Sequence, residues 1–132
     1  MTELNVLELA VLKKLFDGNQ SALIALGRQV DVARVVSRQV TGAGFFTTFT
    51  VPSDVASAHV RDVKIRFGDV EAKIAGLRYG AGFLVYIESG RLQMLEGYSY
   101  DEPWPERVDS FELRYTNQRR PSLGQFFHND AQ

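Results

Sequence analysis

The sequence lacks cysteine altogether, and this absence excludes several kinds of chemistry at once. Disulfide bridges, thiolate zinc sites and cysteine nucleophiles all need a sulfur that the chain does not supply. Proteins of a reducing compartment often do without cysteine, so we expect a cytoplasmic location. Histidine is almost as scarce, because only His59 and His128 are present and neither has a partner at metal-ligand spacing. We therefore expect no metal site, no cofactor and no histidine-based catalysis.

Strong net charge and long apolar runs are also missing. The formal net charge is −1, so no overall field attracts the phosphates of a nucleic acid. No run of about 18 apolar residues is present, so we expect no membrane-spanning helix. The N-terminal stretch MTELNVLELAVLKKLFDG carries early acids and lacks a basic leader and a small-residue cleavage site, so we expect no signal peptide. Neither a nucleic acid nor a membrane is expected as a partner.

Sequence motifs of the common enzyme classes are absent as well. There is no Walker loop for phosphates and no G-x-S-x-G motif for a nucleophilic serine. The tetrapeptide GAGF begins at Gly42 and again at Gly80, but neither copy precedes a helical pattern that would cradle a phosphate. We assign no catalytic residue, and the balance favours a protein that is not an enzyme.

What the chain does contain is typical of one ordinary globular domain over 1–132. Its 132 residues are 45% hydrophobic and 23% charged. Apolar residues recur at helical spacing in two N-terminal segments. They are Leu4, Leu7, Val11 and Leu15, and then Leu23, Leu26 and Val30. We predict two helices, of which Thr2 caps the first and Gly18 closes it. Asn19 or Ser21 is expected to cap the second.

After Asp31 the apolar residues recur at every second position, which is the period of β-strands. Segment 33–51 predicts a hairpin about Gly42-Ala43-Gly44, and segment 83–98 predicts another about Ser89-Gly90. Further strands are expected in 60–67, 70–74 and 110–116. We interpret four arginines as ordinary charges on the solvent side of the sheet, namely Arg34, Arg38, Arg61 and Arg66.

Helices first and strands afterwards indicate an α+β protein. We predict two N-terminal helices packed on one face of a curved, meandering antiparallel sheet of six or seven strands. Residues 117–132 are mostly polar, so we expect them to form a loosely ordered tail.

The register of the second predicted hairpin places one acid among apolar residues. Counted outward from the turn, the cross-strand pairs are Ile87 with Leu92, Val85 with Met94, and Phe83 with Glu96. An ionised carboxylate on that face costs several kcal/mol unless it is paired, accepts backbone N–H groups or keeps its proton. Two plainer interpretations stay open: Glu96 reaches water at the end of the strand, or the sheet is buried on its other face.

The segment LEGYSYDEPWPE, residues 95–106, gathers aromatic and acidic side chains. Two prolines flank Trp104 and restrict the backbone on both sides. A tryptophan held in this way either closes the end of the core or anchors a protein interface. The acids beside it would form a solvated rim. The candidate binding residues are Glu96, Tyr98, Tyr100, Asp101, Glu102 and Trp104.

The stretch from Gly68 to Glu106, GDVEAKIAGLRYGAGFLVYIESGRLQMLEGYSYDEPWPE, resembles small uncharacterised bacterial proteins that pair an apolar hairpin with an acidic aromatic ending. Some similar small α+β proteins are thought to be immunity partners of polymorphic toxins. The resemblance carries no catalytic motif. It implies a binding role for this chain.

Two hypotheses of different classes follow. The first is a small cytoplasmic protein-binding module, of immunity type in one version, that uses the acidic aromatic surface at 96–106 against a partner with a basic surface. The second is a small hydrolase or ligand-binding protein in which Glu96 and Asp101 line a pocket, because paired carboxylates carry out glycoside hydrolysis. A homodimer through a sheet edge or through Phe126-Phe127 is a third arrangement.

Overall fold

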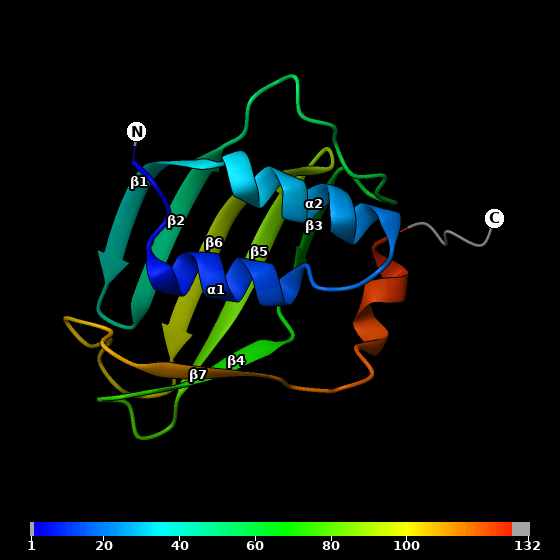
Figure 1. Ribbon diagram of the computed structural model, residues 1–132. Helices are drawn as coiled ribbons and strands as arrows, with labels where there is room; N and C mark the ends of the chain where they lie inside the picture. Colours follow the sequence, from blue (N-terminus) through cyan, green and yellow to red (C-terminus); the bar gives the residue numbers. More distant parts are fainter. Residues whose placement is uncertain (1, 128–132) are drawn as a thin grey trace.

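The computed structural model describes residues 2–127 and has the predicted α+β fold. Two helices lie over one face of a curved antiparallel sheet (Figure 1). The helices are α1 (Val6–Leu15) and α2 (Ser21–Val32), and the strands are β1 (Arg34–Thr41), β2 (Gly44–Thr50), β3 (Lys64–Phe67), β4 (Val70–Ile74), β5 (Ala81–Glu88), β6 (Arg91–Ser99) and β7 (Phe111–Tyr115). A short 3-10 helix, η1 (Pro121–Gln125), follows β7.

The seven strands form a single sheet in the order β1-β2-β6-β5-β4-β7. β3 pairs with β5 as well, so β3 and β4 share one side of that strand. β6 lies at the centre, between β2 and β5, and β1 forms one outer edge. Neither α1 nor α2, the two α-helices within residues 2–127, is long and apolar enough to cross a membrane.

Asn5, rather than Thr2, caps α1. The Asn5 side chain accepts a hydrogen bond from the Glu8 backbone N–H at 2.8 Å, and the Glu8 carboxylate accepts one from the Asn5 backbone N–H at 2.8 Å. This reciprocal pattern is a capping box, and such a cap typically stabilises a helix by about 1 kcal/mol. The prediction for Thr2 was wrong because Thr2 lies upstream of the helix and forms an isolated bridge with Val35.

α2 begins without a side-chain cap. The residue at its N-cap is Gln20, whose side chain makes no capping hydrogen bond, so the prediction of Asn19 or Ser21 was wrong. The connection between the helices depends on Gly18, which has a φ of +148°. This backbone conformation strains any residue with a side chain, and a Cβ atom here would also lie 2.6 Å from a methyl group of Leu23, so glycine is favoured.

The core lies between the helices and the inner face of the sheet. Both predicted helical stripes are buried against alternating residues of the strands, except that Leu4 lies before α1 and is only half-buried. Fully enclosed side chains include Leu12, Leu15, Leu26, Phe83, Val85 and Leu95. Burying an apolar side chain of this size stabilises a fold by about 1.5–3 kcal/mol.

The β5–β6 hairpin turns at Ser89-Gly90, as predicted, and both residues have the positive φ of a tight hairpin turn. The predicted register holds for the first pair only. Gln93 is an extra residue in β6, so the ladder then continues as Tyr86 with Met94, Val85 with Leu95, Leu84 with Glu96, and Phe83 with Gly97.

This bulge overturns the placement of Glu96 on the core face. Side chains alternate between the two faces of a strand, so one inserted residue moves every later side chain to the opposite face. Leu95 is buried in the core, whereas Glu96 is half-buried on the outer face. The sheet is still buried on the predicted face, where Phe83, Val85 and Ile87 lie in the core, and the bulge alone removes Glu96 from it.

The described part of the predicted tail, 117–127, is anchored to the domain by some of its residues. Leu123 and Phe127 are buried in the core, and Val60 forms a bridge with Phe127. The remaining tail residues, 128–132, lie outside the described part of the chain. The apolar residues near the C-terminus therefore complete the core, which their polar surroundings in the sequence had concealed.

Arg120 fastens this C-terminal segment to α1 and to the β3–β4 turn. Its guanidinium pairs with both carboxylate oxygens of Asp69, at 2.6 and 3.1 Å, in a nearly buried position. It also donates to the carbonyl oxygens of Leu15 and Asp17 at the end of α1. The same guanidinium lies 4.4 Å from the centre of the Tyr115 ring, over its face.

We predict that Arg120→Met lowers the free energy of unfolding by about 3–5 kcal/mol, because the nearly buried Asp69 carboxylate loses its partner. The matched control is Arg119→Met, which removes the same charge from an exposed neighbour and should change stability by about 0.5 kcal/mol or less. Urea unfolding of both variants measures the difference. Equal losses in the two variants would contradict this role for Arg120.

Candidate functional site

The six predicted binding residues lie on both sides of the sheet rather than on one surface. Glu96 and Tyr98 extend from β6 on the outer face, away from the helices. The Tyr86 hydroxyl donates a hydrogen bond to the Glu96 carboxylate at 2.7 Å. Trp104 lies on the inner face, beside α1. The segment 96–106 thus wraps around one end of the sheet.

Tyr98 and Tyr100 come together on the outer face. Their rings meet edge to face with centroids 5.6 Å apart. Gly82 of β5 makes room for them, since a Cβ atom there would lie 2.5 Å from the Tyr98 ring and 2.7 Å from the Tyr100 hydroxyl. Burial, together with the neighbouring Tyr100, raises the pKa of Tyr98 to about 12. The Tyr98 phenol is therefore neutral near pH 7 and acts as a hydrogen-bonding aromatic group.

The two acids after the tyrosines have different roles. Asp101 is exposed and adopts a left-handed backbone conformation with a φ of +55°, which an aspartate tolerates better than most residues. Glu102 accepts hydrogen bonds from the backbone N–H groups of Arg78 and Tyr79, both at 2.8 Å. These two bonds hold the pKa of Glu102 below its ordinary value. Glu102 therefore holds the 76–80 loop in place, while Asp101 is open to solvent.

Trp104 partly closes the core at this end of the molecule. Its ring packs edge to face against Phe45 of β2, with centroids 5.3 Å apart, and its backbone N–H donates to the Gly42 carbonyl oxygen at 2.9 Å. A Cβ atom at Gly97 would lie 2.2 Å from the Phe45 ring, so this glycine gives the ring its place. Trp104 remains half-buried and borders a groove on its open side.

The groove lies between the start of α1, the inner face of β1 and β2, and the segment 104–111. It encloses about 610 Å³, a size within the range of small-molecule and peptide sites. Its apolar lining consists of Val6, Leu7, Val40, Phe45, Trp104, Pro105, Val108 and Phe111. Its polar lining consists of Asn5, Glu8, Arg38, Thr47, Glu106 and Asp109.

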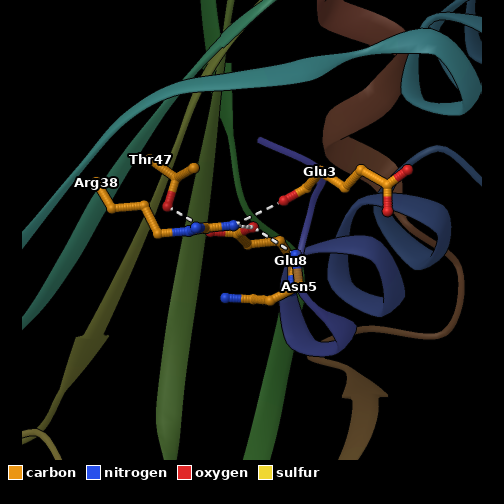
Figure 2. A network of polar contacts seen from close by, with 5 residues as sticks. All are labelled: Glu3, Asn5, Glu8, Arg38 and Thr47. Carbon is orange, nitrogen blue, oxygen red and sulfur yellow. Dashed lines mark hydrogen bonds and ion pairs between the residues drawn. The ribbon is translucent and has the colours of Figure 1, made fainter. Parts of the chain in front are cut away.

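An ion pair between a buried acid and a partly exposed base forms one wall of this groove. Glu8 of α1 is almost fully buried, and Arg38 of β1 pairs with both of its carboxylate oxygens at 2.8 Å. The Thr47 hydroxyl of β2 donates to Glu8 at 2.7 Å, and the Asn5 backbone N–H supplies the fourth hydrogen bond. Figure 2 shows Arg38 and Thr47 reaching from the sheet to the start of the helix.

The hydrogen bonds decide the charge state of Glu8. Burial alone would raise the pKa of this carboxyl group. The hydrogen bonds from Arg38, from the Asn5 backbone N–H and from Thr47 outweigh burial, so the pKa of Glu8 lies below its ordinary value. The same pairing raises the pKa of the Arg38 guanidinium. The pair is therefore fully ionised at neutral pH and carries no net charge.

Sequence reasoning missed this network. Arg38 was interpreted as a solvent-facing charge, and this was wrong because a bulge at Val36 turns the Arg38 side chain to the inner face, opposite Thr47. One local signal was available in Asn5-Val6-Leu7-Glu8, which has the spacing of a capping box. The contact between Glu8 and a strand thirty residues later has no such local signal.

The structure does not bring Glu96 and Asp101 to the groove. A smaller hollow of about 310 Å³ lies on the outer face. It is bordered by Tyr100, together with Glu71, Arg78, Tyr79 and Arg114, but not by Glu96 or Asp101. Within residues 2–127 no cluster of three or more histidine, aspartate or glutamate side chains is placed to hold a metal ion.

We predict that Glu8→Gln lowers the free energy of unfolding by about 2–3 kcal/mol near neutral pH, because Arg38 and Thr47 lose a charged acceptor. The folded-state pKa of Glu8 lies below 4.5. Its contribution is therefore complete above the unfolded-state pKa and is lost as the pH falls through the folded-state pKa. The stability gap between wild type and variant should narrow between about pH 5 and about pH 3.

Urea unfolding at several pH values measures this gap. The control is Glu3→Gln, which removes the same charge from an exposed side chain and should change stability by about 0.5 kcal/mol or less. A gap that stays constant on acidification would show that the Glu8 charge contributes nothing.

Comparison with known proteins gives no family for this chain. No protein-family model, no curated protein and no solved structure matches it. The groove, the Glu8–Arg38 pair and the aromatic segment are therefore the features from which a function is inferred.

Proposed function

We propose that this chain is a binding module for a partner protein, and that the partner occupies the groove beside Trp104. The observation that carries the proposal is the exposure of apolar side chains along an already formed groove. Val6 is 76% exposed and Val40 is 74% exposed, on opposite walls of the groove. Covering them would remove apolar surface from water at about 25 cal/mol for each Å².

Trp104 is suited to the role of anchor. Its flanking prolines and its contact with Phe45 hold the ring in place before any partner arrives. A side chain that is already ordered loses little conformational entropy on binding. Tryptophan is also among the residues that most often dominate the energy of a protein interface. The half-buried ring therefore offers a rigid apolar surface at low entropic cost.

The charges around the groove favour a basic partner. Its polar lining includes three acids, Glu8, Glu106 and Asp109, but only one base, Arg38. Glu8 and Arg38 neutralise each other, and Arg107 pairs with Asp109 at 3.0 Å. Among the described residues, Glu106 is therefore the lining acid without a basic partner, and it sets the local potential. Asp101 adds a further exposed acid at the end of β6. Attraction to a basic surface would speed association and weaken as salt is added.

The outer-face residues belong to the proposal as an adjoining surface. Tyr98 and Tyr100 present aromatic rings, and Tyr100 is 41% exposed. Glu96 lies beside Tyr86 on the same face. A partner that wraps around the end of the sheet would contact this surface as well as the groove. Residues 68–106 resemble small uncharacterised bacterial proteins, and some similar small α+β proteins are thought to be immunity partners of toxins, which is consistent with such a role.

A small-molecule site in the same groove is the second candidate, because the groove volume suits one. The shape favours a protein instead, since a small-ligand site encloses most of its ligand. Six lining residues here are exposed, namely Asn5, Val6, Arg38, Val40, Glu106 and Asp109.

We predict that Val40→Glu weakens capture of the partner at least about tenfold, a loss of about 1.4 kcal/mol. The added carboxylate would lose its water at an apolar contact, and the cost of this desolvation exceeds the gain from attraction to a basic partner. The control is Val63→Glu, because Val63 is similarly exposed, at 64%, and lies outside the groove. Both variants and the wild type are immobilised, and proteins captured from cells that carry the gene are quantified.

A captured protein supports the proposal only if its recovery falls for Val40→Glu and not for Val63→Glu. The captured protein is then purified and titrated into the wild type. Trp104 is the only tryptophan of the chain, so its fluorescence emission reports binding directly once the emission of the added protein is subtracted. Equal recovery by all three proteins would overturn the proposal. A change in Trp104 emission caused by the small-molecule fraction alone would favour the second candidate.

A further inference from the structure

We infer that the partner binds by adding an extended strand to the outer edge of β1, with alternate side chains entering the groove. This inference rests on the proposed function and specifies how the partner binds. Four observations on β1 and its surroundings support it: an unpaired edge, the direction of its backbone groups, the position of the groove and the charge of the groove's rim.

The edge of β1 is open over most of its length. β1 is the outermost strand on its side of the sheet and pairs with β2 alone (Figure 1). Thr2 covers its beginning through two backbone hydrogen bonds with Val35, of 3.1 and 2.7 Å. From Ser37 to Thr41 no other described segment forms a backbone hydrogen bond with this edge. Thr2 thus shows that the edge accepts a strand-like neighbour and leaves the rest of it unoccupied.

The bridge with Thr2 also fixes which backbone groups point outward. Val35 directs both its N–H and its C=O to the edge, because both bond to Thr2. In a strand, the direction of the backbone groups alternates in step with the side chains. Arg38 and Val40 share the inner face with Val35, opposite Thr47 and Phe45 of β2. Their N–H and C=O groups therefore point to the open edge, ready for a ladder with a new strand.

The groove begins directly inside this edge. Arg38 and Val40 are edge residues and also line the groove, with Phe45 and Trp104 beyond them. A strand added to β1 continues the sheet, so every second side chain of that strand points to the inner face. Those side chains lie over the groove. Main-chain hydrogen bonds would supply affinity and the groove would supply selectivity, as in other cases of strand addition.

The occupant that fits is an extended segment with apolar and basic residues on one face. The apolar walls suit the former, and Glu106 on the rim suits the latter, whereas Asp109 is already paired with Arg107. A second copy of β1 fits less well. Its base on the inner face, Arg38, is already bonded to Glu8 of its own chain, so a second copy brings no free base to Glu106. We therefore assign the edge to a different protein rather than to a homodimer.

The probe for this inference is a blocked peptide, SVSKSVSK, whose valines and lysines share one face of a strand. Its control is SVSESVSE, which has the same apolar pattern and opposite charge. The lysine peptide should bind at least about tenfold more tightly. Amide exchange at Arg38 and Val40 should slow on binding, because their N–H groups become hydrogen-bonded. Unchanged exchange at both amides, or equal affinity for both peptides, would overturn the inference.

Two variants separate the backbone from the side chain. Val40→Pro removes the edge-facing N–H and spares the ladder with β2, a substitution that edge strands tolerate. Val40→Thr keeps the N–H and nearly the same shape. The proline variant should bind the lysine peptide at least about tenfold more weakly than the threonine variant. If Val40→Pro fails to fold, slower amide exchange at Arg38 and Val40 of the wild type on peptide binding still tests strand addition.

The outcomes distinguish this inference from the proposed function. A captured partner that binds Val40→Pro as well as Val40→Thr, while Val40→Glu still abolishes capture, would overturn strand addition and leave the groove as the binding site. Equal capture by Val40→Glu and by the wild type would overturn both the groove as the binding site and strand addition at β1. Protection of the Arg38 and Val40 amides in the chain alone, with light scattering that reports a dimer, would assign the edge to a second copy.

Discussion

The buried carboxylate of Glu8 joins three elements that are far apart in the sequence. It closes the capping box at the start of α1, pairs with Arg38 on β1 and accepts the Thr47 hydroxyl of β2. Each oxygen of the carboxylate accepts two hydrogen bonds, which is why a charge can be held in so dry a position. An apolar side chain here would pack, but it would fix neither the register of the helix on the sheet nor the direction of Arg38.

A second charged contact holds the opposite end of the same helix. Arg120 donates to the last carbonyl oxygens after α1 and pairs with Asp69. An acid near the start of a helix and a base near its end both match the helix dipole. α1 is thereby fastened at both ends by groups that also suit its electrostatics. Because α1 forms one wall of the groove, the groove is already shaped before any partner binds, and preorganisation of this kind favours affinity.

Sequence periodicity was sufficient for the architecture but not for the faces of its strands. The two helical stripes, the turn at Ser89-Gly90 and the α+β order follow from local patterns, and the structure confirms them. Gln93 is different, because nothing local indicates that it is the extra residue of a bulge. That one residue moves Glu96 from the core face to the outer face. The Leu92 N–H bonds to the Gln29 side chain of α2 at 2.8 Å, so tertiary contacts help to set this register.

The candidate site, too, was predictable from local sequence only in part. Composition alone singled out the segment 96–106, and the structure brings Tyr98 and Tyr100 together as an aromatic pair. The sequence did not predict that Trp104 lies on the opposite face from the two tyrosines. The chain changes direction after Asp101 and Glu102 and crosses to the inner face there. Nor did the sequence connect Trp104 with Arg38 and Val40, which lie more than sixty residues earlier along the chain. Long-range placement, rather than residue type, creates the groove.

The central claim is that Glu8 is ionised, enclosed and bonded to Arg38 in the folded protein. Carbon-13 NMR of the Glu8 side-chain carboxyl group, followed during acid titration, tests it most directly. The account predicts that this carboxyl group titrates below the ordinary value of 4.5 and that the Arg38 Nε–H exchanges slowly with water as long as the carboxylate is charged. Titration at or above 4.5, with an Arg38 Nε–H that exchanges as fast as that of a free side chain, would contradict the account.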